Sequence, residues 1–582
     1  MDAHKTTSSS SSSSSSNDQI TPPFPSTTPE YHDEKADQAN YVFEKMNVVE
    51  QAEYETSSTE ETKPTFYSRF RKYIHIACWL ILTGFLCAAY ALQIPKGYNQ
   101  ELLVLGLIYL YITLFLFFCY VPTTIITNPW NYVVGSISDI ICKRFSHRVR
   151  TIAWAIIVTV VIVITVFSFP EKEESPRLRR LIALVGFFVF IFGTYITSAH
   201  RKAVQWNTIT TAIFMQFVLA LFVFRCSVGH DIFQWLSTFA ESYLHYSWFG
   251  SDFVFGDTAA NSGVFALTVF PAIIFFASTV QMLYYVGAVQ WIIKKLSVIF
   301  VTLLDVSGAE SIVTIAAPFL GSCENALLIE PLIKDLTKSE IHMVLTCGFA
   351  TISGSVLYGY MAMGVSGEAL LTSCIMSIPC SIAVSKLRYP ETEESIAKHM
   401  KVIPTYSAGG ETTNILHAAG KGAKVGIEIV FLIMANLISL LALLYAFNGF
   451  LTWLGNFLTI ENLTLQLITG YVFVPVAWLI GADDKDLVSV GRLMAIKIWA
   501  NEFVAYKEMI TTYKGLLSVR SQLVATYALC GFANFGSVGM QVGVLSTLAP
   551  TRSGDISRLA ISALICGSIS TWLSASVAGM LN

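Results

Sequence analysis

Two carboxylates, Glu324 and Glu502, are the residues of this chain whose surroundings best suit a functional role. Each follows an apolar run and precedes a block that the sequence uses twice. The block reads Cys347-Gly348-Phe349-Ala350 with Gly354-Ser355-Val356 in the first copy, and Cys530-Gly531-Phe532-Ala533 with Gly536-Ser537-Val538 in the second. An ionisable group at membrane depth is costly, so it is a functional candidate. Paired glycine-broken apolar segments indicate a transporter whose binding site lies between two repeats.

Polar side chains accompany both carboxylates. Asn534 and Ser537 are three residues apart in the second copy, which places them on one face of a helix. Together with Glu502 they suit a ligand rich in hydroxyl groups, although small polar residues also form hydrogen bonds between membrane helices. In the first half, Gly321 allows a tight reversal before Glu324, and the following helix would point its amides at a ligand. Glu324 as a plain helix cap is the alternative.

Composition places the chain among membrane proteins. It is 54% hydrophobic and only 13% charged over 582 residues, whereas about 25% charged residues is usual in soluble domains. The net charge of -3 gives no basic surface for nucleic acid, so no nucleic-acid partner is expected. The eleven cysteines show neither zinc-site spacing nor a disulfide framework. We therefore expect an all-α polytopic membrane protein.

The apolar segments predict about eleven transmembrane helices, each long enough to cross about 30 Å of hydrocarbon. They lie near 74–93, 102–126, 151–169, 181–198, 207–225, 264–293, 340–364, 367–386, 425–450, 521–549 and 558–580. Two further segments near 305–333 and 484–512 are apolar but carry charge near their middle, which predicts re-entrant hairpins that line a cavity. The 463–482 segment fits either a twelfth span or an interfacial helix.

The chain divides into three parts. Residues 1–65 contain a serine run and an acidic stretch, which predict a disordered tail. Residues 66–200 hold extra N-terminal transmembrane helices, and residues 201–582 form the core. Within the core, residues 228–246 carry one apolar face, as expected for a helix lying in the membrane interface.

Loop charges predict the orientation. Arg69, Arg71 and Lys72 precede the first span, so the positive-inside rule places the N-terminus in the cytoplasm. The 226–262 loop has no lysine or arginine and is expected outside. Eleven spans then place the C-terminus outside the cell, together with the glycosylation sequon that begins at Asn462.

At these residues the chain resembles the concentrative nucleoside transporters. The matching blocks are Ser307–Pro331, Thr337–Val365, Asn501–Tyr506, Ala525–Gly539, Phe253–Gly256, Met282–Tyr285, Tyr389–Glu393 and Ala549–Arg552. The resemblance covers about 200–582, and the three extra N-terminal spans resemble animal-type members. It implies a plasma-membrane homotrimer with an inverted repeat, in which each protomer moves a transport domain like an elevator against a scaffold.

The resemblance also implies a role for each site residue. Glu502, Asn534 and Ser537 would hold the ribose hydroxyls of a nucleoside. The base would lie against a second group of residues, namely Ser322, Cys323, Glu324, Val356 and Phe532. The family usually reads Gly-Gln-Thr-Glu where this chain has Gly321-Ser322-Cys323-Glu324. Base preference therefore cannot be inherited from relatives.

The residues leave two interpretations of the coupling cation open. The resemblance implies ligands from the carbonyls of Leu320 and Ile352 and the hydroxyl of Thr351, and oxygen donors at a helix break suit a hard cation. The sodium-coupled pattern has asparagine four residues before Gly321, whereas this chain has Ala317. Sodium symport is the first interpretation, and proton coupling is the alternative. No other cofactor is expected.

An enzyme, a channel and a receptor are the other classes of function that we considered for this sequence. An intramembrane enzyme would need a nucleophile–base pair or a metal cluster, and no such spacing is found, so we do not expect an enzyme. An aqueous channel or a non-transporting receptor would also bind a polar solute at the same depth, and both remain alternatives.

Overall fold

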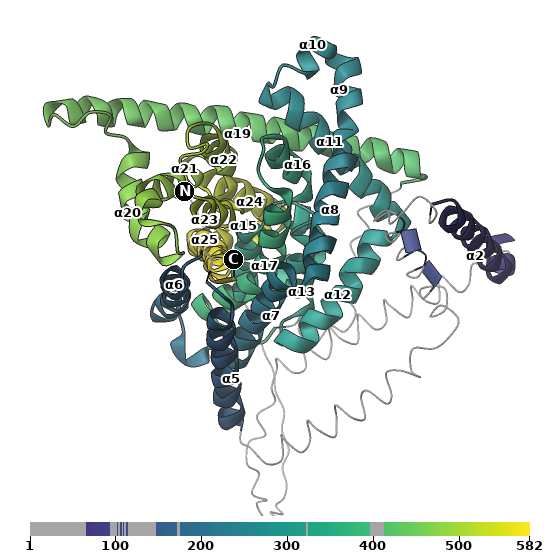
Figure 1. Ribbon diagram of the computed structural model, residues 1–582, viewed down its shortest axis with the longest axis horizontal. Coiled ribbons are helices and arrows are strands. Elements are labelled where there is room, and N and C mark those ends of the chain that lie inside the picture. The colour runs from purple at the N-terminus through teal and green to yellow at the C-terminus, as the bar shows by residue number, and fades with distance from the viewer. Residues whose placement is uncertain are drawn as a thin grey trace, which may run out of the picture. The chain divides into compact units, whose positions relative to one another are not determined.

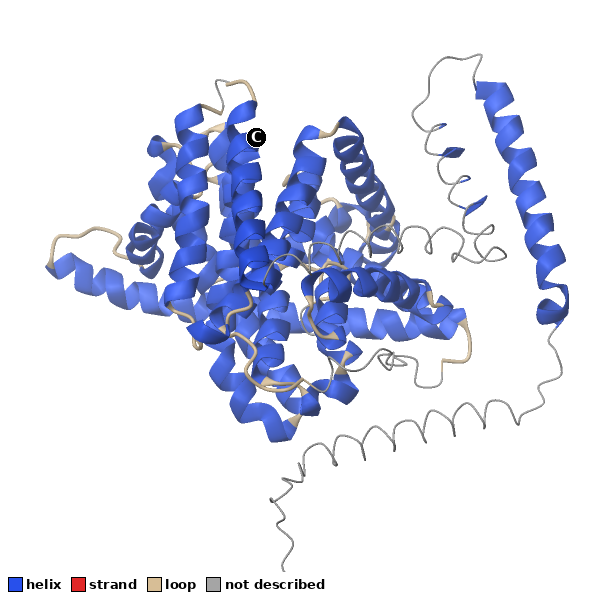
Figure 2. Ribbon diagram, turned by 90° about the horizontal axis from the view of Figure 1, so that it is seen from below, coloured by secondary structure: helices blue, strands red, loops and turns tan. Residues whose placement is uncertain are grey.

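The protein is described here from a computed structural model of the 582-residue chain. It describes residues 66–93, scattered positions between 102 and 113, and then 147–171, 175–321, 324–395 and 412–581. All regular elements of these residues are helices (Figure 1, Figure 2). The chain forms two compact units, Met1–Ile140 and Ile141–Asn582. The predicted tail over 1–65 and most of the predicted 102–126 span lie outside the described residues.

The first unit contributes one long described helix, α2 (Phe66–Gln93). The first helices of the second unit are α5 (His147–Ser168), α6 (Arg177–Ile196), η2 (Arg201–Ala203), α7 (Trp206–Arg225), α8 (Ser227–His245), α9 (Ser247–Phe255), α10 (Asp257–Ala260), α11 (Phe265–Val286) and α12 (Ala288–Leu304). Next come α13 (Gly308–Ala316), α14 (Glu324–Leu328), η3 (Glu330–Asp335), α15 (Lys338–Ala350), α16 (Gly354–Ala362) and α17 (Gly367–Arg388).

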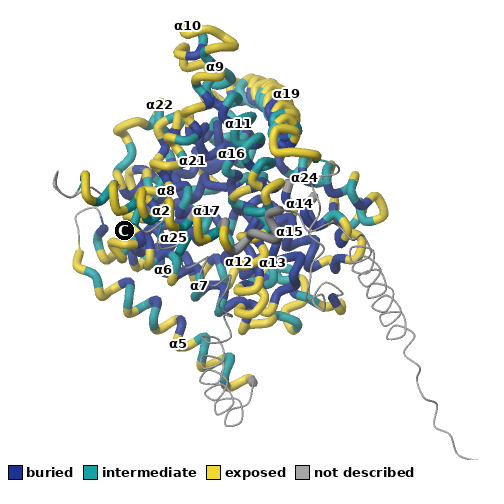
Figure 3. The backbone as a smooth tube through the Cα atoms, turned by 90° about the vertical axis from the view of Figure 1, so that its right-hand side faces the viewer, coloured by how far each residue is buried: buried dark blue, intermediate teal, exposed yellow. Residues whose placement is uncertain are grey.

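The remaining helices complete the second unit. They are α19 (Ile415–Phe457), α20 (Leu465–Leu479), η4 (Asp484–Asp486), α21 (Leu487–Trp499), α22 (Glu502–Thr511), α23 (Val519–Leu529), α24 (Phe535–Leu548), η5 (Pro550–Arg552) and α25 (Ser553–Leu581). Helices α15, α17 and α25 pack against one another and are largely buried, whereas α5 and α19 are exposed over most of their surface (Figure 3).

Nine helical segments of the described residues are long and apolar enough to cross a bilayer. They are His75–Gln93, Arg148–Ser168, Arg177–Ile196, Trp206–Arg225, Phe265–Val286, Lys338–Ala362, Gly367–Arg388, Ile415–Phe457 and Pro550–Leu581. Each coincides with a segment that the sequence predicts as a span. The chain is therefore an all-helical, multi-span membrane protein. The ambiguous 463–482 segment contains α20, a shorter apolar helix of 15 residues.

Three predicted spans differ from the structure. The span expected over 521–549 is two shorter helices, α23 and α24, and is not among the nine segments. The span expected over 264–293 is two helices, because Gly287 adopts a left-handed conformation (φ 86°) that ends α11. The span expected over 425–450 is only part of α19, which runs for 43 residues and is seen as a long helix in Figure 1. Gly422 and Gly426 let α19 approach α11, since an added Cβ would lie 2.6 Å from the Ala277 carbonyl oxygen and 2.7 Å from the Ile274 Cα.

The glycine-broken segments of the repeated block are confirmed as interrupted helices. The first breaks between α15 and α16 at residues 351–353, and the second breaks between α23 and α24 at residues 530–534. Helix pairs lie where the two hairpins were predicted, namely α13 with α14 and α21 with α22. Arg492 on α21 pairs with Glu508 on α22 at 3.4 Å, so these two helices fold back beside each other. The predicted amphipathic segment 228–246 forms α8, with Trp235 exposed and Phe233 buried.

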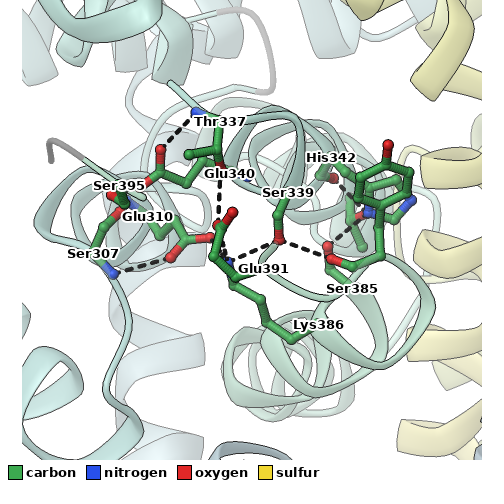
Figure 4. Close-up of polar contacts among 12 residues, drawn as sticks. Ser307, Glu310, Thr337, Ser339, Glu340, His342, Ser385, Lys386, Glu391 and Ser395 are labelled. Atoms are coloured by element: carbon green, nitrogen blue, oxygen red, sulfur yellow. Dashed lines mark hydrogen bonds and ion pairs between the residues drawn. The ribbon is translucent and has the colours of Figure 1, made fainter. Parts of the chain in front are cut away.

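A buried ionic cluster fixes the start of α13 (Figure 4). Glu310 accepts from the Ser307 N–H as part of a capping box, and its other carboxylate oxygen lies 2.5 Å from the Lys386 Nζ on α17. Lys386 also donates to Ser339 at 3.1 Å and pairs with Glu391 at 3.5 Å. Removing one partner of such a buried pair is strongly destabilising. The cluster thus ties the α13–α14 pair to α15 and α17.

Candidate functional site

The breaks of the two interrupted helices contact each other. The backbone N–H of Phe532, in the second break, donates to the carbonyl oxygen of Thr351, in the first, at 3.3 Å. Gly531 makes this approach possible, because an added Cβ would lie 2.8 Å from the Phe349 carbonyl oxygen. The two copies of the repeated block therefore meet in space although 183 residues separate Cys347 from Cys530.

Glu502 joins the two halves at this crossing. It is the first residue of α22 after the N-cap Asn501, and its side chain is buried. One carboxylate oxygen accepts from the Tyr360 hydroxyl on α16 at 3.1 Å, and the other accepts from the Asn534 amide nitrogen at 2.9 Å. Its position near a helix N-terminus favours the negative charge. The carboxylate is thus held between α16 and α24.

Asn534 and Ser537 lie at the start of α24, and Asn534 contacts this carboxylate. Asn534 is the N-cap of α24, and its side-chain oxygen accepts from the Ser537 backbone N–H at 2.7 Å. The same amide donates to Glu502, so its orientation is fixed from both ends. Both side chains are buried. A carboxylate and an amide therefore meet at the start of α24, with Ser537 in its first turn, and these groups are candidates to bind a polar ligand with several hydroxyl groups.

The residues predicted to face the base are only partly described. Val356 is buried in the first turn of α16, and Phe532 is partly buried in the second break. Ser322, Cys323 and the side chain of Glu324 lie outside the described residues, although Glu324 begins α14. The structure thus brings Val356 and Phe532 to the two breaks and does not test the other three.

The residues predicted to bind the cation lie where two helices end. Leu320 follows α13, Thr351 is the C-cap of α15, and Ile352 is the next residue; all three are buried. The Thr351 hydroxyl donates to the Cys347 carbonyl oxygen at 3.2 Å. Carbonyl groups at helix C-termini carry partial negative charge, which suits a cation. Among the described residues, no group of three or more His, Cys, Asp or Glu side chains could hold a metal ion.

Two polar residues at the crossing were missed in the sequence. Tyr360 was overlooked because an aromatic residue in an apolar run usually packs in a core. Lys497 carried a clearer signal, since it is a lone lysine in the apolar run 493–500, five residues before Glu502. It is 2% exposed in the structure.

Two cavities in the second unit lie away from Glu502. A cavity of about 1060 Å³ runs between α5 and α7, with Arg148 and Trp206 in its lining. A second, of about 30 Å³, adjoins the Glu310–Lys386 pair. Neither is lined by Glu502, Asn534 or Ser537.

Three family models match the second unit. They are described as "Na+ dependent nucleoside transporter N-terminus" over residues 185–258, "Nucleoside recognition" over 266–367 and "Na+ dependent nucleoside transporter C-terminus" over 369–579. Their order follows the chain, and together they include both copies of the repeated block.

Individual proteins are similar over the same region. Sodium/nucleoside cotransporter 1 of Sus scrofa is 39% identical over 424 residues, which are 70% of this chain but 65% of the relative, so less than two thirds of that relative is covered. Solute carrier family 28 member 3 of Eptatretus stoutii is 34% identical over 538 residues, covering 89% of this chain and 76% of the relative. A solved structure of CNTnw in an inward-facing substrate-bound state superposes with a TM-score of 0.65 at 35% identity, covering 69% of this chain and 97% of that one. The chain belongs to the concentrative nucleoside transporter family.

Proposed function

We propose that this protein is a secondary active transporter that imports nucleosides across the plasma membrane by symport with sodium. The observation that carries the proposal is the position of Glu502, a buried carboxylate held by Tyr360 and Asn534 where two interrupted helices cross. A buried ionisable group at a helix break is a typical substrate or ion site in a transporter. Membership of a family of transporters supports transport rather than an enzymatic reaction.

In this proposal the sugar and the base contact different halves of the site. Glu502, Asn534 and Ser537 bind the ribose, because their donors and acceptors match vicinal hydroxyl groups. The base lies near Val356 and Phe532, and the tip of the α13–α14 pair supplies Ser322, Cys323 and Glu324. Ser322 and Cys323 have shorter side chains than the glutamine and threonine that the family usually has at these positions. Purine or pyrimidine preference therefore has to be measured.

The sodium ion binds at the carbonyl oxygens of Leu320 and Ile352 and at the Thr351 hydroxyl. The C-terminal ends of α13 and α15 supply the negative potential at this point. One observation favours proton coupling as a second candidate. Ala317, at the C-cap of α13, offers no side-chain oxygen where the sodium-coupled pattern has one.

The membrane arrangement is proposed on the same basis. The helix pairs α13–α14 and α21–α22 enter and leave the bilayer from one side as re-entrant hairpins, and the two halves form an inverted repeat. Eleven spans place the N-terminus in the cytoplasm and the C-terminus outside. Three protomers assemble, and each moves its transport domain like an elevator.

Uptake of radiolabelled uridine, cytidine, adenosine, inosine and guanosine tests the proposal. Cells expressing the protein are expected to accumulate at least one of these nucleosides above the external concentration, and replacement of sodium by choline is expected to stop accumulation. Stimulation by low external pH in choline medium would establish the proton-coupled alternative. Uptake that only equilibrates, whatever the sodium concentration or pH, would contradict symport and indicate a channel.

Ser537→Ala tests the sugar contact with little disturbance of the fold. The Ser537 backbone N–H, rather than its hydroxyl, completes the cap of α24. Loss of one neutral hydrogen bond costs about 0.5–1.5 kcal/mol, so affinity for a ribonucleoside is expected to fall by about two- to tenfold. Of the 2′-deoxy and 3′-deoxy nucleosides, the one that lacks the hydroxyl bound by Ser537 is expected to show little loss of affinity in the variant.

Competition by 2′-deoxy and 3′-deoxy nucleosides against labelled ribonucleoside measures this difference. Thr547→Val is the matched control, because Thr547 lies on the same helix and donates only to the Gly543 carbonyl oxygen. Equal losses for all three sugars would mean that the Ser537 hydroxyl has a structural role only.

A further inference from the structure

The ends of the helices at the crossing differ in one basic residue between the two halves. In the first half, α13 packs against α15, and neither helix has a basic residue in its last turn. In the second half, α21 packs against α23, and the last turn of α21 carries Lys497. The order of elements is otherwise the same: two short helices, then an interrupted helix. The second half thus brings its own cation to a place where the first half has none.

Lys497 reaches the end of the second interrupted helix. Its Nζ donates to the Ala528 carbonyl oxygen at 2.8 Å and to the Thr571 hydroxyl oxygen at 3.4 Å. Ala528 lies in the last turn of α23, directly before the break that begins at Cys530. Thr571, on α25, also donates to the Ala528 carbonyl oxygen, at 3.1 Å. The ammonium therefore binds a backbone carbonyl at a helix C-terminus, as a bound metal cation would.

No carboxylate pairs directly with Lys497 in the part of the chain that the structure describes. Both oxygens of Glu502 are occupied by Tyr360 and Asn534. Lys497 lies in the last turn of α21, five residues before Glu502 at the start of α22. Burying an ammonium group is costly unless other groups compensate it. Here the C-terminal ends of α21 and α23 and the nearby Glu502 supply that compensation.

The first half has a similar set of acceptors without the ammonium. The ends of α13 and α15 come together, since the Cys347 thiol on α15 donates to the Val313 carbonyl oxygen on α13 at 3.9 Å. The Thr351 hydroxyl lies at the end of α15, as the Thr571 hydroxyl lies beside the end of α23. This is the place where the coupling cation is proposed to bind.

We propose that Lys497 is a tethered cation that takes the place of a second coupling ion in the second half of the molecule. The inference rests on the proposed sodium symport and adds a reason for its stoichiometry. The second break has Lys497 beside it as part of the chain, whereas the first break is neutralised only when a cation binds from solution. In this proposal, sodium binding changes the charge only at the first break. The second break keeps its arrangement beside Glu502 whether or not sodium is bound.

Two neutral substitutions distinguish this role from simple packing. Lys497→Ala removes the charge and leaves room beside the Ala528 carbonyl oxygen for a cation from solution. Lys497→Met removes the charge but fills the space with a side chain of similar length. Lys497→Arg retains the charge. Thr526→Val is the matched control, because Thr526 lies on α23 like Ala528, its hydroxyl donates to the Gln522 carbonyl oxygen rather than contacting Lys497, and the substitution changes no charge.

The sodium dependence of nucleoside uptake is the main measurement. The Hill coefficient cannot exceed the number of cooperating sites, so we expect about 1 for the unmodified protein and a rise towards about 2 in Lys497→Ala. Lys497→Met is expected at the cell surface without uptake at any sodium concentration. Lys497→Arg and Thr526→Val are expected to keep the shape of the original sodium curve.

Several outcomes would overturn the proposal. One is Lys497→Ala with an unchanged sodium curve, and another is Lys497→Met with normal uptake. A third is Thr526→Val with the same change as Lys497→Ala. If Lys497→Ala does not transport, thermal denaturation of the purified full-length protein replaces uptake, because a ligand that binds only the folded state stabilises it. Sodium is then expected to raise Tm more steeply with concentration than in the unmodified protein, and an equal dependence would contradict the inference.

The unmodified protein separates this inference from the proposed function. If it shows no sodium-driven uptake and no sodium-dependent Tm, the proposed symport fails whatever the variants do. If it shows both and the Lys497 variants behave like it, only the inference about Lys497 fails.

Discussion

Replacement of Glu502 by glutamine is expected to lower the apparent affinity for nucleoside by about ten- to a hundredfold, since a hydrogen bond to a charged group contributes about 1.5–3 kcal/mol. Glutamine keeps the shape of the side chain and removes its charge. It also replaces one acceptor oxygen by a donor, so it can no longer accept from both Tyr360 and Asn534. Initial rates of uptake over a range of nucleoside concentrations measure the loss, with cell-surface labelling to correct for expression.

Glu508→Gln is the matched control for this substitution. Glu508 lies on the same helix, α22, and pairs with Arg492 on α21, away from both breaks. Arg492 is partly exposed, so loss of this pair is expected to change stability by less than about 1 kcal/mol. If Glu502→Gln transports as well as Glu508→Gln, Glu502 does not bind the substrate.

The sequence groups the candidate site residues but does not show which side chains hold them in place. Glu502, Asn534 and Ser537 could be grouped because one falls before the repeated block and two fall inside it at helical spacing. Their partners come from elsewhere in the chain. Tyr360 lies 142 residues from Glu502, and nothing near it in sequence marks it as a partner.

Some helix boundaries could likewise be predicted from neighbouring residues, and others could not. The ends of α15 and α23 were expected because glycine and small polar residues interrupt both apolar runs. The end of α11 at Gly287 was missed, because the residues on either side of Gly287 are as apolar as a continuous span. The length of α19 was also missed, since its first turns contain Lys421 and Lys424 and hydropathy alone excludes them.

The roles of individual glycines depend on contacts that sequence does not reveal. Gly531 and Gly539 lie eight residues apart in the same apolar stretch, and nothing in the sequence distinguishes their roles. In the structure, an added Cβ at Gly531 would meet Phe349, Ala350 and Thr571, whereas one at Gly539 would meet nothing within 4 Å. The difference arises from the first half of the chain, which supplies Phe349 opposite Gly531.

Gly531→Ala is accordingly expected to abolish uptake and destabilise the protein by about 1–3 kcal/mol, the usual cost of overpacking a filled core. The new methyl group would lie 2.8 Å from the Phe349 carbonyl oxygen and 2.9 Å from the Thr571 Cγ2. Relief of the first contact requires movement of the α15 backbone, which would also disturb the Phe532–Thr351 hydrogen bond. Uptake and the Tm of the purified protein measure the two effects.

Gly539→Ala is the control, and it is expected to retain uptake and to gain up to about 1 kcal/mol, because alanine favours a helix over glycine. Combining Gly531→Ala with Thr571→Ser shows which neighbouring atom, the Phe349 carbonyl oxygen or the Thr571 Cγ2, excludes a methyl group at position 531. Serine keeps the hydroxyl that donates to Ala528 and removes the Cγ2 methyl group. Because the Phe349 carbonyl oxygen would still be in place, the double variant is expected to remain inactive. Recovery of uptake would show that the methyl group of Thr571, rather than the backbone of the first break, is what requires glycine at the crossing.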